Sequence, residues 1–203
     1  MNIQMIHVIA IAATSAALFA QGCQGNRGPT SESAGAATTK VDPGQLSARA
    51  KRLVGTKARP FTVDSIEGDE FCLDDADGEI LVIDFWNIGC AACLSDMPVM
   101  QEVSDWIDRN DLPARAITIH TTDGRRNSRL IDSIRDYTSR NKITVPILLD
   151  REDSEFRANY AVESWPRIVV IGPDGTIEHV MTTFGSWNKN QLEEAISRLS
   201  AAD

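Results

Sequence analysis

The sequence has no long basic run and offers few metal ligands. Its 29 Asp and Glu residues outnumber 20 Lys and Arg residues, so the net charge is -9 at pH 7. A chain this acidic, whose basic runs are as short as Arg125-Arg126, is not suited to bind a polyanion, which excludes nucleic acid as a partner. Three His and four Cys are present, with one C-x-x-C pair. A structural zinc site needs four such ligands, and no second C-x-x-C pair is present to complete a set with Cys90 and Cys93, so no metal site is predicted.

The sequence also has no apolar run that would span a bilayer comfortably. Residues 8–20, VIAIAATSAALFA, are uncharged but too short, and they suit the apolar region of a secretory signal peptide. The run ends in LFAQGC, which resembles the lipobox of bacterial lipoproteins, whose cysteine is acylated after cleavage. We therefore predict that residues 1–22 are a signal peptide of the lipoprotein type and that Cys23 is lipidated. The alternative is cleavage after Ala20 without lipidation.

The next segment lacks the large apolar side chains that a core requires. Residues 24–44 are rich in Gly, Ser, Thr and Ala. As a flexible tether they would have a root-mean-square reach on the order of 25 Å. We predict a flexible linker over residues 23–44 and a single folded domain over residues 45–203. The expected location is the periplasmic or extracytoplasmic face of a membrane, with attachment through the lipid.

From Leu53 onward, short apolar runs alternate with helical spacing. The predicted strands are residues 61–66, 70–75, 79–86, 114–120, 144–150, 167–172 and 176–182. Helices are predicted to start near Cys93 and at Asn127-Ser128, with a short one around residues 154–160 and a last one through Leu192, Ile196 and Leu199. Strands that alternate with helices predict an α/β sheet with parallel pairs. The turn at residues 173–175, PDG, predicts that the last two strands form an antiparallel hairpin.

The C-x-x-C pair stands between a predicted buried strand and a predicted helix. Cys90 would then lie at the start of the helix, where unpaired backbone N–H groups and the helix dipole favour negative charge. Lowering a thiol pKa from about 8.5 toward 7 corresponds to roughly 2 kcal/mol of preferential thiolate stabilisation. We predict that Cys90 is the attacking sulfur and that Cys93, one turn later and more covered, resolves the mixed disulfide.

Two segments of the sequence carry a family resemblance. In IDFWNIGCAACLSDMP, residues 83–98, a strand, an aromatic pair, the C-x-x-C motif and a proline within a helix follow one another. In YAVESWPRIVVIGPDG, residues 160–175, a Trp-Pro pair precedes a strand and a hairpin. On these segments the chain from about Leu53 to Leu199 resembles the thioredoxin superfamily, and within it the exported TlpA/ResA-like thiol-disulfide oxidoreductases. The resemblance implies an α/β thioredoxin-like fold with a central mixed β-sheet flanked by helices.

The resemblance also implies a substrate surface. It places Pro166 in the cis form against the dithiol, and the backbone of Trp165 beside an extended client segment. Trp86 and Gly89 would border the same surface. Most family members have Trp where this chain has Gly89, and many have Pro inside the C-x-x-C motif, where this chain has two alanines.

The same resemblance implies roles for two carboxylates. Asp84 matches the buried acid beneath the dithiol of thioredoxins, and Asp96 matches the active-site glutamate of the ResA-like branch. Either could exchange a proton with Cys93, because burial raises a carboxyl pKa toward neutral pH. The alternatives are that Asp84 is half-exposed and that Asp96 only favours the start of the helix.

The resulting hypothesis is a thiol-disulfide oxidoreductase with no cofactor other than the Cys90-Cys93 disulfide. Its partners would be protein thiols and disulfides and a membrane dithiol that donates electrons, and reduction of clients such as apocytochromes c is favoured over oxidation. The alternatives from other classes are a copper(I) chaperone that uses both thiolates and His120, a thiol peroxidase, and a binding module without turnover.

Overall fold

The computed structural model describes residues 47–122, 126–151, 155–182 and 189–201. The predicted signal peptide, the lipidation site Cys23 and the predicted linker lie outside these ranges and stay predictions. Within the described residues, no helix has both the length and the apolar character needed to cross a bilayer.

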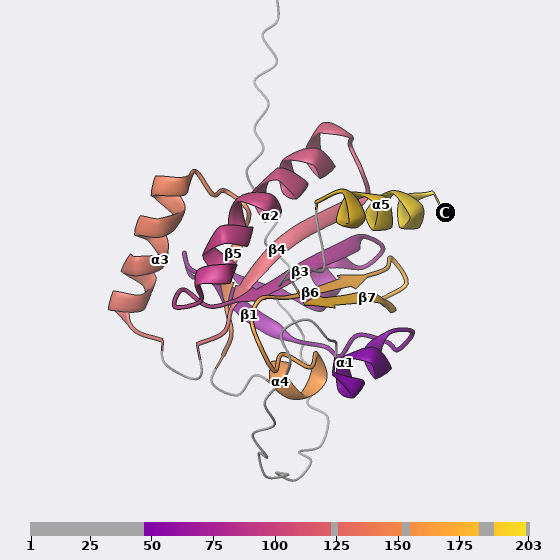
Figure 1. The fold of residues 1–203 in the computed structure, drawn as a ribbon, viewed down its shortest axis with the longest axis horizontal. Coiled ribbons are helices and arrows are strands. Elements are labelled where there is room, and N and C mark those ends of the chain that lie inside the picture. Colours follow the sequence, from indigo (N-terminus) through magenta and orange to yellow (C-terminus); the bar gives the residue numbers. More distant parts are fainter. Residues whose placement is uncertain (1–46, 123–125, 152–154, 183–188, 202–203) are drawn as a thin grey trace, which may run out of the picture.

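A seven-stranded mixed sheet forms the centre of the structure (Figure 1). The strands along the chain are β1 (Thr62–Ser65), β2 (Glu70–Cys72), β3 (Ile80–Trp86), β4 (Ala114–His120), β5 (Ile147–Leu149), β6 (Arg167–Ile171) and β7 (Ile177–Thr182). Their order across the sheet is β2-β1-β5-β4-β3-β6-β7. β3 is parallel to β4 and antiparallel to β6, and β6 pairs with β7 as an antiparallel hairpin. The predicted α/β class with a mixed sheet is confirmed.

Helices cover both faces of the sheet. They are α1 (Ala48–Leu53), α2 (Ala91–Arg109), α3 (Ser128–Asn141), α4 (Phe156–Asn159) and α5 (Lys189–Ser200), with a 3-10 turn, η1 (Leu73–Ala76). The core on one face takes residues from α2, α3 and α5, and the core on the other takes residues from α1, η1 and α4 (Figure 1). Because both faces are covered, all seven residues of β3 are buried, which explains why every one of them except Asp84 is apolar.

Local capping explains where two helices begin. The side chain of Asn127 accepts a hydrogen bond from the N–H of Leu130, so α3 starts where the Asn127-Ser128 signal predicted. α2 starts at Ala91, two residues before the predicted position, because the sulfur of Cys90 accepts a hydrogen bond from the N–H of Cys93 and caps the helix.

Local features differ from the sequence prediction in three places. The strand expected over residues 144–150 covers only Ile147–Leu149. The second strand was expected over residues 70–75 but ends at Cys72. There the Asp75 carboxylate accepts from the N–H of Cys72, a local bond that competes with strand pairing and starts the 3-10 turn. Helix α1 was not predicted, because only Ala50 of its six residues is buried and the sequence therefore shows no apolar face.

Candidate active site

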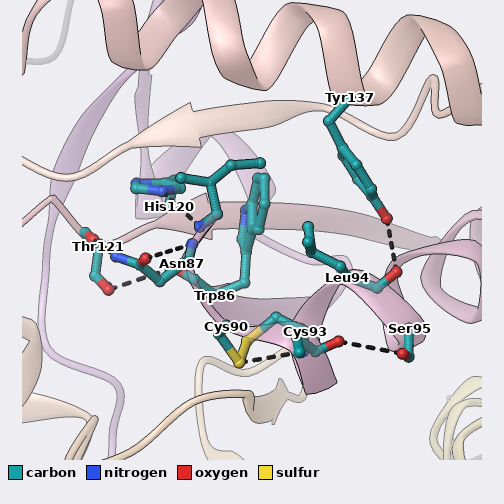
Figure 2. Close-up of a disulfide and its surroundings, with 12 residues drawn as sticks. Trp86, Asn87, Cys90, Cys93, Leu94, Ser95, His120, Thr121 and Tyr137 are labelled. Atoms are coloured by element: carbon teal, nitrogen blue, oxygen red, sulfur yellow. Dashed lines mark hydrogen bonds between the residues drawn. A yellow bond between two sulfur atoms is a disulfide. The ribbon is translucent and has the colours of Figure 1, made fainter.

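The two cysteines of the C-x-x-C motif form a disulfide at the start of α2 (Figure 2). Cys90 lies at the N-cap position and is partly exposed, whereas Cys93 is fully buried. The N–H of Cys93 donates to the sulfur of Cys90 over 3.1 Å. This donor and the N-terminal end of the helix dipole would both stabilise a thiolate at Cys90 after reduction. The arrangement therefore distinguishes an accessible sulfur from a covered one.

The loop that leads into the dithiol folds around Asn87. Its carbonyl oxygen accepts from the N–H of Cys90 over 3.0 Å, and its Oδ1 accepts from the N–H of Gly89 over 2.9 Å. A Cβ atom on Gly89 would lie 3.2 Å from that Oδ1, so a larger residue would press on the Asn87 side chain. Gly89 is exposed, which leaves the surface beside Cys90 open.

The end of β4 holds the same loop from the other side (Figure 2). The N–H of Ile88 donates to Nε2 of His120 over 2.9 Å, and the side-chain amide of Asn87 donates to the carbonyl oxygen of Thr121 over 2.9 Å. The lone pair on His120 Nε2 is therefore engaged within the protein, which disfavours its use as a copper(I) ligand. Among the residues that the structure describes, no group of three or more His, Cys, Asp or Glu side chains is placed to hold a metal ion.

Trp86 does not reach the protein surface. Its ring is fully buried, 5.0 Å from the ring of His120 in an edge-on arrangement and 6.3 Å from the ring of Tyr137. The prediction that its side chain borders the substrate surface is therefore corrected. The buried position follows from the alternation of β3, which turns Val82 and Trp86 toward the core beneath α2.

Asp84 lies on this same face of β3 and is fully buried. Burial, reinforced by the nearby negative charge of Asp96, raises the pKa of Asp84 to about 8. Neither carboxyl oxygen of Asp84 accepts a hydrogen bond from a described residue. The alternative that Asp84 is half-exposed is therefore wrong. Asp96 is half-buried on α2, close enough to act on Asp84 electrostatically, but its role toward Cys93 stays a prediction.

The peptide bond between Trp165 and Pro166 is cis, as the resemblance predicted. Pro166 directly precedes β6, whose first residue pairs with Phe85 of β3. Because these strands are antiparallel, Pro166 comes next to the end of β3, from which the loop to Cys90 departs. Trp165 is half-buried and packs against the cores on both faces of the sheet. The two halves of the predicted site, distant in sequence, are thus brought to one edge of the sheet.

The structure adds Arg167, which sequence analysis placed only within a strand. Its side chain is fully buried, and none of its guanidinium nitrogens donates a hydrogen bond to a described residue. Burial lowers the pKa of Arg167, and Glu163 partly opposes that change. The sequence shows that a basic residue directly follows Pro166. Because Arg residues are seldom fully buried, the sequence gives no reason to expect this side chain in the interior.

A proline inside α2 is compensated from a neighbouring helix. Pro98 has no N–H, so the carbonyl oxygen of Leu94, four residues earlier, loses its helical donor. The hydroxyl of Tyr137 on α3 donates to that oxygen over 2.7 Å (Figure 2). Leu94 directly follows Cys93, so this bond joins α3 to the first turn of the dithiol helix.

This compensation predicts a non-additive pair of substitutions. Tyr137→Phe should lower the free energy of unfolding by about 1 kcal/mol, because it leaves the Leu94 carbonyl without its donor. In a Pro98→Ala background the N–H of residue 98 can bond to Leu94, so the same change should have a smaller effect. Urea denaturation of the four proteins measures the coupling. Equal losses in both backgrounds would show that the Tyr137 hydroxyl does not replace the missing N–H.

Comparisons with known proteins agree with this geometry. Thioredoxin-like protein YneN of Bacillus subtilis is 23% identical over 143 residues, which is 70% of this chain and 78% of that protein. Thiol-disulfide oxidoreductase ResA of Geobacillus thermodenitrificans is 25% identical over 146 residues, or 72% of this chain and 78% of that protein. A crystal structure of a secreted disulfide oxidoreductase of Mycobacterium tuberculosis matches with a TM-score of 0.56 at 21% identity, covering 68% of this chain and 96% of that one.

The structural match confirms the predicted thioredoxin-like fold, a mixed sheet flanked by helices. A family model covers residues 54–180, which is more than half of the chain and includes both cysteines of the motif. The chain belongs to the AhpC/TSA family.

Proposed function

We propose that this protein is a thiol-disulfide oxidoreductase that exchanges disulfides with other proteins through Cys90 and Cys93. One observation carries the proposal: a partly exposed cysteine at a helix N-terminus is paired with a fully buried one. This arrangement suits an attacking and a resolving sulfur. The names of the relatives ResA and YneN support the same chemistry.

In the reductive direction, the Cys90 thiolate attacks one sulfur of a client disulfide. The client disulfide breaks, a mixed disulfide forms, and the first client sulfur leaves as a thiolate that takes a proton from water. Cys93 then passes its proton to Asp84, in molecules whose Asp84 carboxylate is ionised, and attacks the Cys90 sulfur. The second client sulfur leaves as a thiolate and takes the proton that Asp84 accepted, the Cys90-Cys93 disulfide forms, and the client has gained two electrons and two protons.

We further propose that the chain works outside the cytoplasm as a reductase. The apolar run before Cys23 and the secreted relative from Mycobacterium tuberculosis support export. In an oxidising compartment a reductase needs a supply of electrons, so we propose a membrane dithiol donor that reduces the Cys90-Cys93 disulfide. Apocytochromes c that await haem attachment are the favoured client class, by analogy with the ResA-like branch.

The test is a redox titration of the purified protein in glutathione buffers, with free thiols trapped by alkylation. A reductase is expected to show a two-electron midpoint near or below about -270 mV, whereas a midpoint near about -120 mV would identify an oxidant that inserts disulfides. Cys90→Ser provides the control without a dithiol. If the two thiols never exchange with glutathione but bind one copper(I) ion tightly, the oxidoreductase proposal is wrong and the copper alternative replaces it.

A further inference from the structure

The loop before Cys90 is held by the end of β4 through several hydrogen bonds. The residues involved are Trp86, Asn87 and Ile88 on one side and His120 and Thr121 on the other. Besides the contacts of Ile88 and Asn87 described above, the N–H of Thr121 donates to the Trp86 carbonyl over 2.9 Å. We call this set of contacts the β4 clamp. Its members are 32 to 35 residues apart in sequence, and the parallel register that pairs Trp86 with His120 brings them together.

Among the contacts of the β4 clamp, the one that His120 makes with Ile88 is nearest in sequence to Cys90. Its Nε2 accepts from a backbone N–H, so that nitrogen carries no proton, and the neutral ring has its proton on Nδ1. The side chain is 1% exposed and its ring lies edge-on against Trp86. Packing therefore fixes the direction in which the Nε2 lone pair points.

The strand end that carries His120 is itself braced by Asp150, which directly follows β5. The N–H of Asp150 donates to the His120 carbonyl over 3.1 Å. In return, Oδ1 of Asp150 accepts from the N–H and the hydroxyl of Thr122, over 2.7 Å and 2.6 Å. The clamp is thus anchored in two neighbouring strands rather than in a free loop, so it can hold the position of Ile88.

We propose that His120 is a positioning residue for the attacking cysteine. By holding the N–H of Ile88, two residues before Cys90, the ring keeps the Cys90 sulfur at the N-cap of α2, where it accepts from the Cys93 N–H. In this role His120 does not touch the reacting sulfur. The inference rests on the proposed function of Cys90 and assigns to His120 a purpose other than the copper ligation considered from the sequence.

The test compares three variants by the rate at which reduced Cys90 reacts with iodoacetamide at pH 7. His120→Phe keeps an aromatic ring against Trp86 but removes the acceptor. Cys90 should then leave the N-cap position, and its alkylation should slow by about five- to tenfold, since one unit of thiol pKa changes the thiolate fraction tenfold. His120→Gln supplies a carbonyl oxygen as a replacement acceptor and should stay within about twofold of the parent rate.

The third variant, Ile119→Val, controls for lost stability. Ile119 precedes His120 on β4 but packs in the core on the opposite face of the sheet, so the lost methyl group weakens the fold without touching the clamp. Its alkylation rate should match the parent. A parent-like rate in His120→Phe together with a lower melting temperature would overturn the proposal, because His120 would then be only structural. Slowing in His120→Gln equal to that in His120→Phe would also overturn it.

If His120→Phe does not fold, a measurement on the unmodified protein tests whether His120 Nε2 accepts the hydrogen bond from Ile88. Nitrogen-15 NMR of the imidazole should show a protonated Nδ1 and an unprotonated Nε2. A proton on Nε2 would exclude the Ile88 contact and with it the proposal. If Cys90 in the parent protein reacts no faster than Cys93, the proposed function fails instead, and the NMR spectrum still reports separately on the clamp.

Discussion

Cys93→Ser is expected to accumulate a mixed disulfide between Cys90 and a client, whereas Cys90→Ser should accumulate none. Cys90 is the sulfur that solvent reaches, and it sits where the N–H of Cys93 and the start of α2 stabilise a thiolate. Cys93 is fully buried and is placed to attack only its neighbour. Removing the resolving sulfur should therefore stop the reaction after its first step.

The effect on turnover should be very large for both substitutions. A serine hydroxyl is not ionised near neutral pH, so each variant should lose on the order of a thousandfold or more in the reduction of a disulfide-bonded peptide. Non-reducing electrophoresis and mass spectrometry of the trapped species distinguish the two roles. Ala91→Ser is the matched control, because it places a hydroxyl between the cysteines and keeps both thiols. A trapped complex in Cys90→Ser, and none in Cys93→Ser, would reverse the assignment.

The features that could be predicted from the sequence are those set by neighbouring residues. The apolar run of β3 followed by C-x-x-C predicts a strand, a turn and a helix in order, and Asn127 predicts the start of α3 through a single capping bond. The failures are local as well. α1 buries only Ala50, so its pattern is too weak to detect, and the carboxylate of Asp75 ends β2 earlier than its apolar residues suggest.

The parts of the site that could not be predicted depend on contacts across the sheet. His120 was considered from the sequence as a copper(I) ligand, but its bond to Ile88 requires the parallel register of β3 and β4 and could not be predicted. The burial of Trp86 depends on what covers the face of β3 toward which it points. Arg167 is fully buried although arginine is mostly exposed in proteins, so its burial could not be expected from its residue type.

The second large effect concerns Asp84 and the pH dependence of stability. Burial first, and then the charge of Asp96, raises the pKa of Asp84 from 3.8 to about 8 in the folded protein. Between about pH 4 and pH 8 the native state therefore holds one proton more at this group than the unfolded state does. The stability that this proton confers is fully present below pH 4 and is lost as the pH rises through 8, at about 1.4 kcal/mol per pH unit.

Asp84→Asn removes this dependence, because the amide does not titrate. From pH 5 to pH 7 the parent protein should lose about 2.7 kcal/mol through Asp84, so the variant should gain that much relative to the parent over the same interval. Urea denaturation of the oxidised proteins at pH 5, 6 and 7 gives the free energy of unfolding of the variant and of the parent. Titrating groups that the two proteins share contribute equally to both values and cancel when one is subtracted from the other. Asp77→Asn, at an exposed position, is the matched control for the loss of a carboxyl group. A constant difference between variant and parent would show that Asp84 is ionised throughout.

The pKa of Asp84 also connects the stability measurement with the proposed mechanism, in which the ionised carboxylate accepts the proton of Cys93. A buried carboxyl group whose pKa lies near 8 can exchange a proton with a thiol near neutral pH, whereas an amide in its place cannot. Asp84→Asn should therefore slow the attack of Cys93 on the mixed disulfide by on the order of a hundredfold, while the first attack by Cys90 changes little. Stopped-flow measurement of the two steps separates these outcomes. Equal slowing of both steps would mean that Asp84 acts on the dithiol as a whole rather than on Cys93.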